Sequence, residues 1–228
     1  MIRLVVIMCL LAGPAFALKC QNDTFEGIFF SRCEATLGQD DIRLFLRDDT
    51  GTLLGYFPTL REHLGTQNLN ILFAMNAGMY RPDHSPAGHY IEEGQVMRRV
   101  ITRAGPGNFG LLPNGVLCIT KNRADVYETQ AFLQRSPSCR FATQSGPMLV
   151  INGALHPRFT AASTSKFIRN GVGASSDGQS VFLAISNAPL TLHAFARYFK
   201  VHLNLNSALY LDGNVSRLYA PLINREDF

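Results

Sequence analysis

The sequence predicts a single α+β domain in which a mixed, twisted β-sheet is partly covered by helices. Apolar runs of strand length, each bounded by turn residues, outnumber the segments with helical periodicity. Most connections between the runs are of hairpin length, as at Pro113-Asn114-Gly115 and Asp177-Gly178. The chain contains no internal repeat and no Ser/Gly linker that would separate two domains. We therefore expect one sheet-based core.

The predicted strands are short apolar segments between Gly, Pro and Asn turns. In chain order they span residues 42–46, 71–75, 115–120, 147–151, 181–186 and 208–211. A short helix is predicted over residues 58–64 and a longer one over 190–203. In the longer segment, near-helical spacing relates the apolar residues Leu192, Phe195, Ala196, Phe199 and Leu203. Arg197 and Lys200 fall on the opposite face, so the apolar face is available to cover the sheet.

The first 17 residues have the pattern of a cleavable export signal. Arg3 precedes an apolar run over residues 4–12, and Ala15-Phe16-Ala17 then provides the small-x-small motif that predicts cleavage after Ala17. The run is shorter than the roughly 20 residues that a transmembrane helix needs. We expect residues 18–228 to form the mature domain, exported to the periplasm or secreted, with no stable membrane span.

The predicted mature domain contains four cysteines, Cys20, Cys33, Cys118 and Cys139. An even number in an oxidising compartment favours disulfides. Three connectivities are possible, and sequence proximity favours the pairs Cys20–Cys33 and Cys118–Cys139. Each bond closes a short loop and is expected to stabilise the fold by roughly 2 to 4 kcal/mol. The alternative, a catalytic cysteine, lacks flanking residues that would activate a thiolate.

Charge and motif content exclude several classes of function. Removal of Arg3 with the signal leaves 20 basic residues against 17 acidic ones, a net charge of +3, which indicates neither nucleic acid nor an anionic membrane as a partner. The sequence has no HExxH pair, GxSxG elbow, Walker loop or dinucleotide fingerprint. Asp83-His84 with His89 could hold a metal but is more typical of a solvated loop. We therefore expect neither a cofactor nor a metal.

Several predicted strands end in clusters of polar and small residues, where a ligand can approach the backbone. The clusters are Asn76-Ala77-Gly78-Met79-Tyr80, Gln144-Ser145-Gly146-Pro147, Arg169-Asn170-Gly171-Val172-Gly173 and Asp212-Gly213-Asn214-Val215-Ser216. Each alone is typical of a turn. Since strand ends on one side of a sheet can share an opening, we expect Asn76, Gln144, Arg169 and Asp212 to converge on one polar cleft.

In this order, the clusters resemble the phosphodiester glycosidase domain family, whose animal representative is the uncovering enzyme of lysosomal targeting. The similarity covers roughly residues 70–220. It is closest to the bacterial branch, through Gly107-Asn108-Phe109-Gly110, Pro113-Asn114-Gly115-Val116 and residues 142–149. By itself, the segment 105–110 suggests a phosphate cradle, but a loop is the better interpretation because it contains Pro106 and no helix is predicted after it.

The resemblance implies an exported hydrolase that cleaves a sugar from a glycosyl phosphodiester, with an envelope glycan or lipid-linked sugar as substrate. Asp212 would stabilise the oxocarbenium-like centre or activate water, Arg169 would bind the phosphate, and Asn76 would complete the catalytic set. Substrate-binding positions would be Gly78, Gln144, Ser145, Gly146, Asn170, Gly213 and Ser216. Asp177 is interpreted as a turn residue. The alternative is a non-catalytic periplasmic protein that binds a glycan or phosphosugar on the same fold.

Two positions depart from the family pattern. Asn214-Val215 replaces two glycines of the family's acidic loop, and Arg217 follows Ser216 where a smaller residue is usual. The substituted side chains restrict backbone that glycine would leave open to substrate, so the substrate is expected to differ from that of the animal enzyme. Asn214-Val215-Ser216 is also a glycosylation sequon. A glycan on this loop would obstruct it, which favours a bacterial origin.

Overall fold

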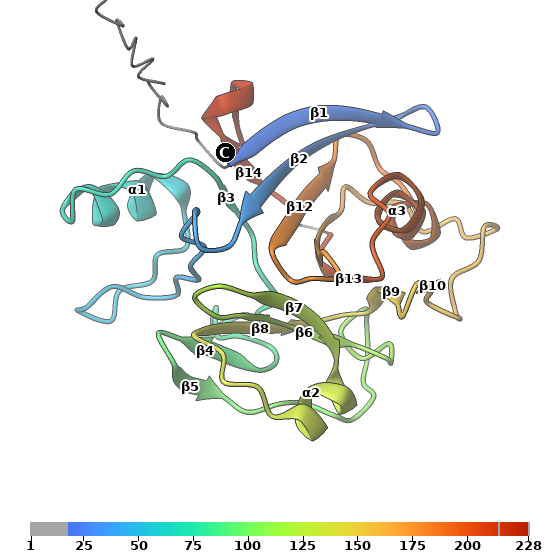
Figure 1. Cartoon of the computed structure of the whole chain (residues 1–228), viewed down its shortest axis with the longest axis horizontal. Coiled ribbons are helices and arrows are strands. Elements are labelled where there is room, and N and C mark those ends of the chain that lie inside the picture. Colours follow the sequence, from blue (N-terminus) through green and yellow to red (C-terminus); the bar gives the residue numbers. More distant parts are fainter. Residues whose placement is uncertain (1–17, 214, 228) are drawn as a thin grey trace, which may run out of the picture.

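The computed structural model describes residues 18–213 and 215–227 (Figure 1). The predicted export signal, residues 1–17, and Asn214 lie outside the described residues. Strands predominate over helices, which confirms the α+β class. The strands form a seven-stranded sheet in the order β1-β2-β12-β11-β13-β9-β10, a five-stranded sheet in the order β5-β4-β8-β6-β7 and a three-stranded sheet in the order β15-β14-β3.

The first half of the chain supplies the edge of the seven-stranded sheet and most of the five-stranded sheet. Its elements are β1 (Lys19–Phe25), β2 (Ile28–Thr36), α1 (Phe57–Gly65), β3 (Ala74–Met75), β4 (Tyr90–Glu92), β5 (Gln95–Arg98), β6 (Gly115–Ile119), β7 (Ala124–Glu128) and α2 (Thr129–Arg135). The second half contains β8 (Phe141–Ser145), β9 (Met148–Ile151), β10 (Ala154–Leu155), β11 (Asn170–Ala174), β12 (Ser180–Ser186), α3 (Leu192–Arg197), a π-helical turn (Tyr198–His202), β13 (Ser207–Asp212), β14 (Leu218–Ala220), a 3₁₀ turn (Pro221–Ile223) and β15 (Arg225–Glu226).

Four predicted strands are confirmed as β6, β9, β12 and β13, each with boundaries within one residue of the prediction. The prediction of a mixed sheet was wrong, because the paired strands in all three sheets are antiparallel. Hairpins account for much of this, as at Asp177-Gly178, which joins β11 to β12. Gly178 has a φ of 73° there, a conformation that favours glycine.

Other sequence predictions failed locally. Residues 42–46 form no strand, and of residues 71–75 only Ala74–Met75 is a strand. Pro113-Asn114-Gly115 is not a hairpin turn, because β6 pairs with β7 and β8, which both follow it in the chain. The amide of Asn114 is buried there and donates to the Phe109 carbonyl.

Both helices were located correctly. Pro58 is the second residue of α1 and lies in its first turn, where proline is tolerated. The hydroxyl of Thr191 caps α3 by accepting from the Ala194 N–H. Phe195, Ala196 and Phe199 are fully buried, as the apolar stripe predicted, and in Figure 1 α3 lies against the seven-stranded sheet.

The core lies on both sides of β13, because alternate residues of a strand point to opposite faces. Ala208 and Tyr210 belong to the apolar cluster formed with α3. Leu209 and Leu211 belong to a cluster formed with Leu117 and other residues of the five-stranded sheet. The central strand is therefore covered on both faces, and its carboxyl end, at Asp212, reaches the rim of the core.

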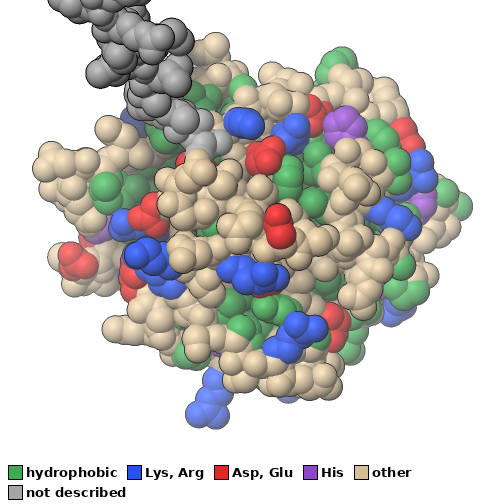
Figure 2. Space-filling view, in the orientation of Figure 1, with side chains coloured by type: hydrophobic (Ala, Val, Ile, Leu, Met, Phe, Trp, Pro, Cys, Tyr) green, Lys and Arg blue, Asp and Glu red, His purple; other side chains and the backbone are tan. Residues whose placement is uncertain are grey.

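Both predicted disulfides are present. Cys20–Cys33 joins β1 to β2, and Cys118–Cys139 joins β6 to the segment before β8. On the face seen in Figure 2, acidic and basic side chains are interspersed among neutral and apolar ones, which fits the small net charge. Within residues 18–213 and 215–227, no helix is long and apolar enough to span a membrane.

Candidate functional site

Asn170 links the two chain segments that form the candidate site, the loop after β3 and the end of β13. Its side chain is fully buried at the start of β11, opposite Asp212 in the register with β13. The Nδ2 group donates to the carbonyl of Asn76 at 2.8 Å, and the Oδ1 atom accepts from the backbone N–H of Asp212, also at 2.8 Å. One amide thus fixes the loop after β3 against the end of β13, although these segments lie far apart in the sequence.

The end of β13 carries a β-bulge. Asn170 pairs with Asp212 and Gly171 pairs with Tyr210, so Leu211 is the extra residue. Bulges bend a strand and redirect the side chains beside them. Here the bulge lies immediately before Asp212, which lines a cavity of about 230 Å³ together with Met79, Asn108, Phe167, Tyr210 and Gly213.

The loop after Asp212 is tied back to the same junction. The hydroxyl of Ser216 donates to the carbonyl of Asp212 at 3.1 Å, and Ser216 is buried. The backbone N–H of Arg217 donates to Oδ1 of Asn76 at 2.7 Å. Asn76 is therefore held through both its carbonyl and its side-chain oxygen.

Two tyrosines lie in the electric field of Asp212. Burial raises the pKa of Tyr80, and the negative charge of Asp212 raises it further. Burial also raises the pKa of Tyr210, an effect that Arg169 opposes and Asp212 reinforces. Both phenols therefore stay protonated at neutral pH and can donate hydrogen bonds to an anion.

Arg169 lies beside Asn170 and is almost fully buried, with 1% of its surface exposed. Its Nε donates to the Leu190 carbonyl at 2.8 Å, and Nη2 donates to the Ser165 carbonyl at 3.0 Å. The guanidinium also lies 5.3 Å from the ring centres of both Phe167 and Tyr210. Among the described residues, Nη1 has no hydrogen-bond partner.

The electrostatics of Arg169 follow from this environment. Burial lowers the pKa of the guanidinium, and the nearby phenol of Tyr210 partly offsets that effect. Nη1 lies 3.7 Å from the position that a Cβ atom on Gly213 would occupy, and Gly213 lines the cavity. Two donors of the guanidinium are thus bonded to carbonyls, which removes the bidentate fork from ligand binding. The Nη1 amino group, with its two N–H donors, remains beside the cavity wall.

The other predicted site residues are structural neighbours of this cavity. Gln144 is 1% exposed, and its amide group bonds to the backbone of His89 and Ile101 and to the hydroxyl of Thr129. Its side chain thus faces the loop before β6 and does not join the cluster at Asp212. Asp212 lines the small cavity, Asn76 lines a different one, and Arg169 lies beside Tyr210 in the wall, so convergence of the four residues on one cleft stays a prediction.

Ser145, Gly146 and Gly78 hold the strands close together. The buried hydroxyl of Ser145 donates to the Leu211 carbonyl at 2.8 Å and so ties β8 to the bulge. A Cβ atom on Gly146 would lie 2.6 Å from that of Asn114, and one on Gly78 would collide with the hydroxyl of Thr143. The glycines are therefore required by close packing at these positions.

Asp83, His84 and His89, which the sequence suggested as a possible metal site, make separate contacts in the structure. Asp83 accepts hydrogen bonds from the backbone and hydroxyl of Ser85, whereas the His84 ring packs against Tyr80. His89 is buried, and its Nδ1 atom bonds to the carbonyl of Arg98. In the part of the chain that the structure describes, no three His, Cys, Asp or Glu side chains gather as a metal site.

Sequence reasoning missed the tyrosines and the apolar walls of the cavity. Tyr80 was named only as the last residue of its cluster, and neither Tyr210 nor Phe167 was predicted to belong to the site. Asn108 was noted only within its glycine-rich loop, yet it lines the cavity. Their positions in the sequence could have identified the two tyrosines. Tyr80 ends the cluster that begins at Asn76, and Tyr210 lies two residues before the cluster that begins at Asp212.

A half-buried carboxylate and the phenol of Tyr210 line a small cavity at strand ends of an antiparallel α+β domain, and the buried guanidinium of Arg169 lies beside that tyrosine. Comparison with known proteins identifies the family. The chain belongs to the phosphodiester glycosidase family, whose model matches residues 70–227. It is 35% identical over 178 residues to the uncharacterized protein YigE of Escherichia coli K12, a match that covers 78% of this chain and 69% of YigE.

Two solved structures share the fold. The zebrafish N-acetylglucosamine-1-phosphodiester alpha-N-acetylglucosaminidase catalytic domain, auto-inhibited by its pro-peptide, matches 89% of this chain and 72% of its own, with a TM-score of 0.57 and 15% identity. A hypothetical protein from Synechocystis matches 92% of this chain and 59% of its own, with a TM-score of 0.54 and 14% identity. At these identities the likeness establishes the fold alone.

Proposed function

We propose that this protein hydrolyses a glycosyl phosphodiester at the cavity beside Asp212. Water adds to the anomeric carbon, the bond from that carbon to the phosphate oxygen breaks, and the products are a free sugar and a phosphate monoester. The leaving phosphate is already a stable anion, so the reaction needs less general-acid assistance than ordinary glycoside hydrolysis. The main requirement is stabilisation of charge on both sides of the breaking bond.

The buried guanidinium of Arg169 is the observation that carries the proposal. Its positive charge is stabilised by carbonyl oxygens and aromatic faces, and among the described residues its Nη1 amino group has no hydrogen-bond partner. A buried cation is costly unless an anion compensates it. A phosphate in the cavity would supply that anion at the wall formed by Gly213, with the phenol of Tyr210 as a second donor.

Asp212 has the complementary role on the sugar. Its backbone N–H donates to Oδ1 of Asn170, and its own Oδ1 accepts from the backbone N–H of Gly213, so the residue is held where it lines the cavity. A fixed carboxylate next to the anomeric carbon stabilises positive charge that develops in the transition state, or it removes a proton from the attacking water. Asn170, Asn76 and Ser216 act as positioning residues.

The test is Asp212→Asn, assayed beside Asp177→Asn for release of phosphate monoester from a panel of methyl diesters of sugar 1-phosphates. Asp177 is the matched control, because it occupies a hairpin turn and its Oδ1 bonds to Ser175 and Gln179. We expect Asp212→Asn to lower kcat by a factor on the order of 10² to 10³ with little change in binding. If both variants keep the wild-type rate, Asp212 is not catalytic. If the wild-type protein binds these diesters saturably but cleaves none of them, the hypothesis of a non-catalytic binding protein replaces that of a hydrolase.

We also propose that the protein acts outside the cytoplasm. Its two disulfides support this location, since such bonds persist in oxidising compartments.

A further inference from the structure

We propose that a second, larger cavity binds the hydrocarbon chain of the substrate, so that the preferred substrate is an amphiphilic glycosyl phosphodiester with a long alkyl or isoprenoid group on its phosphate. The inference rests on the proposed function and names the class of substrate for the same site. It is carried by the shape of the cavity, by the residues that line it and by the wall that it shares with the cavity at Asp212.

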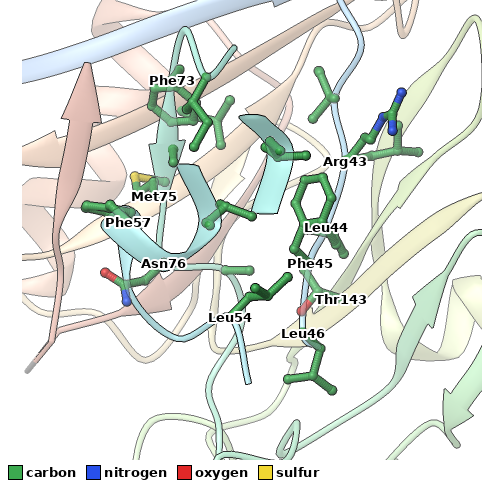
Figure 3. Close-up of a pocket in the computed structure, with 18 of the residues that line it drawn as sticks. Arg43, Leu44, Phe45, Leu46, Leu54, Phe57, Phe73, Met75, Asn76 and Thr143 are labelled. Atoms are coloured by element: carbon green, nitrogen blue, oxygen red, sulfur yellow. The ribbon is translucent and has the colours of Figure 1, made fainter. Parts of the chain in front are cut away.

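The larger cavity has a volume of about 600 Å³. It lies between α1, the extended segment 39–57, β3 and the bulged end of β13, with Leu211 in its wall (Figure 3). This volume falls in the range of small-molecule sites, which are typically lined by apolar side chains with few polar groups. Figure 3 shows Leu44, Phe45, Leu54 and Phe73 around the hollow, whereas the charged end of Arg43 points away from it.

Large apolar side chains remain only half-buried here. Ile42, Leu44, Phe45, Phe57 and Phe73 all have intermediate exposure, and all line the cavity. In the clusters that flank β13, Leu149, Phe195 and Leu209 are completely buried, whereas Ile42 and Leu44 are only partly buried where they pack against one of these clusters. Apolar surface that faces a hollow forfeits both its removal from water and its contacts with other atoms. A hydrocarbon ligand would restore both, whereas a polar ligand would restore neither.

The two cavities share one wall, and this indicates that the occupant is part of the substrate. In β13, Leu211 lines the larger cavity and its neighbour Asp212 lines the smaller one. In the loop after β3, Gly78 and Tyr80 line the larger cavity, whereas Met79 between them lines the smaller one. A ligand with its sugar at Asp212 therefore has residues that line the apolar hollow one position away along the chain.

Tyr80 is placed to separate the two parts of such a ligand. Its ring lines the larger cavity and its side chain is 43% exposed. Partial burial and the negative charge of Asp212 both raise the pKa of its phenol, which therefore stays protonated at neutral pH. A protonated phenol at this position can donate to a phosphate oxygen, while the ring contacts the first carbons of the chain.

The binding test uses 11-(dansylamino)undecanoic acid, whose fluorescence rises on transfer from water to an apolar site. The cavity variants are Leu60→Trp on α1 and Leu44→Trp on the extended segment, since both leucines line the cavity and tryptophan would fill it. Leu133→Trp is the matched control, a helical leucine that is 45% exposed on α2. Thermal unfolding checks that each variant folds, and two cavity variants guard against the failure of one.

We expect saturable binding of one probe per chain, at least tenfold weaker in the cavity variants and unchanged in Leu133→Trp. Binding of the probe that is equal in all four proteins would overturn the inference. So would cavity variants that bind no less tightly but convert a dimer to a monomer, because a second copy would then be the occupant.

The kinetic test compares methyl and dodecyl diesters of one sugar 1-phosphate. Each methylene that is buried in the cavity is expected to lower KM by up to about fourfold, so the dodecyl ester should have a much lower KM, and the difference should collapse in Leu60→Trp. If the methyl ester is cleaved and chain length has no effect, the proposed function stands and this inference fails. If neither ester is cleaved but the probe binds at Leu60, the proposed function fails and the apolar site stands.

Discussion

Replacement of Asn170 by alanine isolates the junction that holds the site together. The substitution leaves the carbonyl of Asn76 and the backbone N–H of Asp212 without the partners they have at 2.8 Å. An unsatisfied buried polar group costs about 1 to 3 kcal/mol, and the two groups together give a loss of roughly 2 to 6 kcal/mol in the free energy of unfolding. The weaker contact between Ser216 and Oδ1 of Asn170, at 3.4 Å, adds little.

The assay is urea unfolding, in which the midpoint should fall while the slope stays constant. Asn70→Ala, at an exposed position, is the control and should change the free energy by less than about 0.5 kcal/mol. A loss below that value in Asn170→Ala would refute the argument, because the two backbone groups would then have found other partners without cost. The effects of Asn170→Ala and Asp212→Asn on kcat should also be non-additive, since Asn170 acts by placing Asp212.

Two further substitutions test the surroundings of the site and the edge of the sheet. Gly213→Ala should destabilise the protein by about 1 to 3 kcal/mol in thermal or urea unfolding, because the new methyl group would collide with the buried hydroxyl of Tyr210; an unchanged stability would show that the Tyr210 ring moves freely. Burial raises the pKa of Asp23, but hydrogen bonds from Gln21, Tyr198 and Arg32 outweigh it, so its pKa in the folded protein is lowered. The resulting stabilisation is present above the unfolded pKa of about 3.9 and is lost as the pH falls through the folded value. Asp23→Asn should therefore be less stable than the wild type at pH 7, and the gap should narrow below about pH 4; a gap that is constant with pH would contradict this assignment.

The sequence predicted the central strands well because their side chains are apolar and buried on both faces. In β6, every residue from Gly115 to Ile119 is buried, and an uninterrupted apolar run is what such a strand requires. Residues 42–46 are also mostly apolar, with Arg43 among them, but form no strand. Composition reports that a segment is apolar, and tertiary context decides whether it pairs.

The hairpin of β1 and β2 was missed for the opposite reason. β1 is largely polar and exposed, so it has no apolar run to reveal it. The turn did carry a signal, since Glu26 and Gly27 both adopt positive φ, at 51° and 75°, as a tight two-residue hairpin turn requires. Glutamate is not a typical residue for that conformation, and the Glu-Gly pair was passed over.

The site was predictable in position but not in the direction of its side chains. Asn170 and Asp212 are neighbours because β11 and β13 pair in register, and the polar clusters at the strand ends indicated this. Gln144 also lies at a strand end, yet its amide turns toward Ile101 and Thr129. Adjacent residues of a strand point to opposite faces, so an error of one residue in register reverses the assignment of a side chain.

Most polar residues of the family pattern bond to backbone in this fold. Asn170 holds the backbone of two loops, Ser145 holds the carbonyl of Leu211, and Gln144 holds the loop at Ile101. These residues specify the shape of the cavity, and a protein that only binds its ligand would need them as much as an enzyme would. The proposed chemistry would depend on the few charged or phenolic residues that line the cavity, Asp212 and Tyr210 among them. The family pattern is therefore stronger evidence for the geometry of the site than for hydrolysis, and substitutions that change charge while keeping shape are the ones that test the reaction.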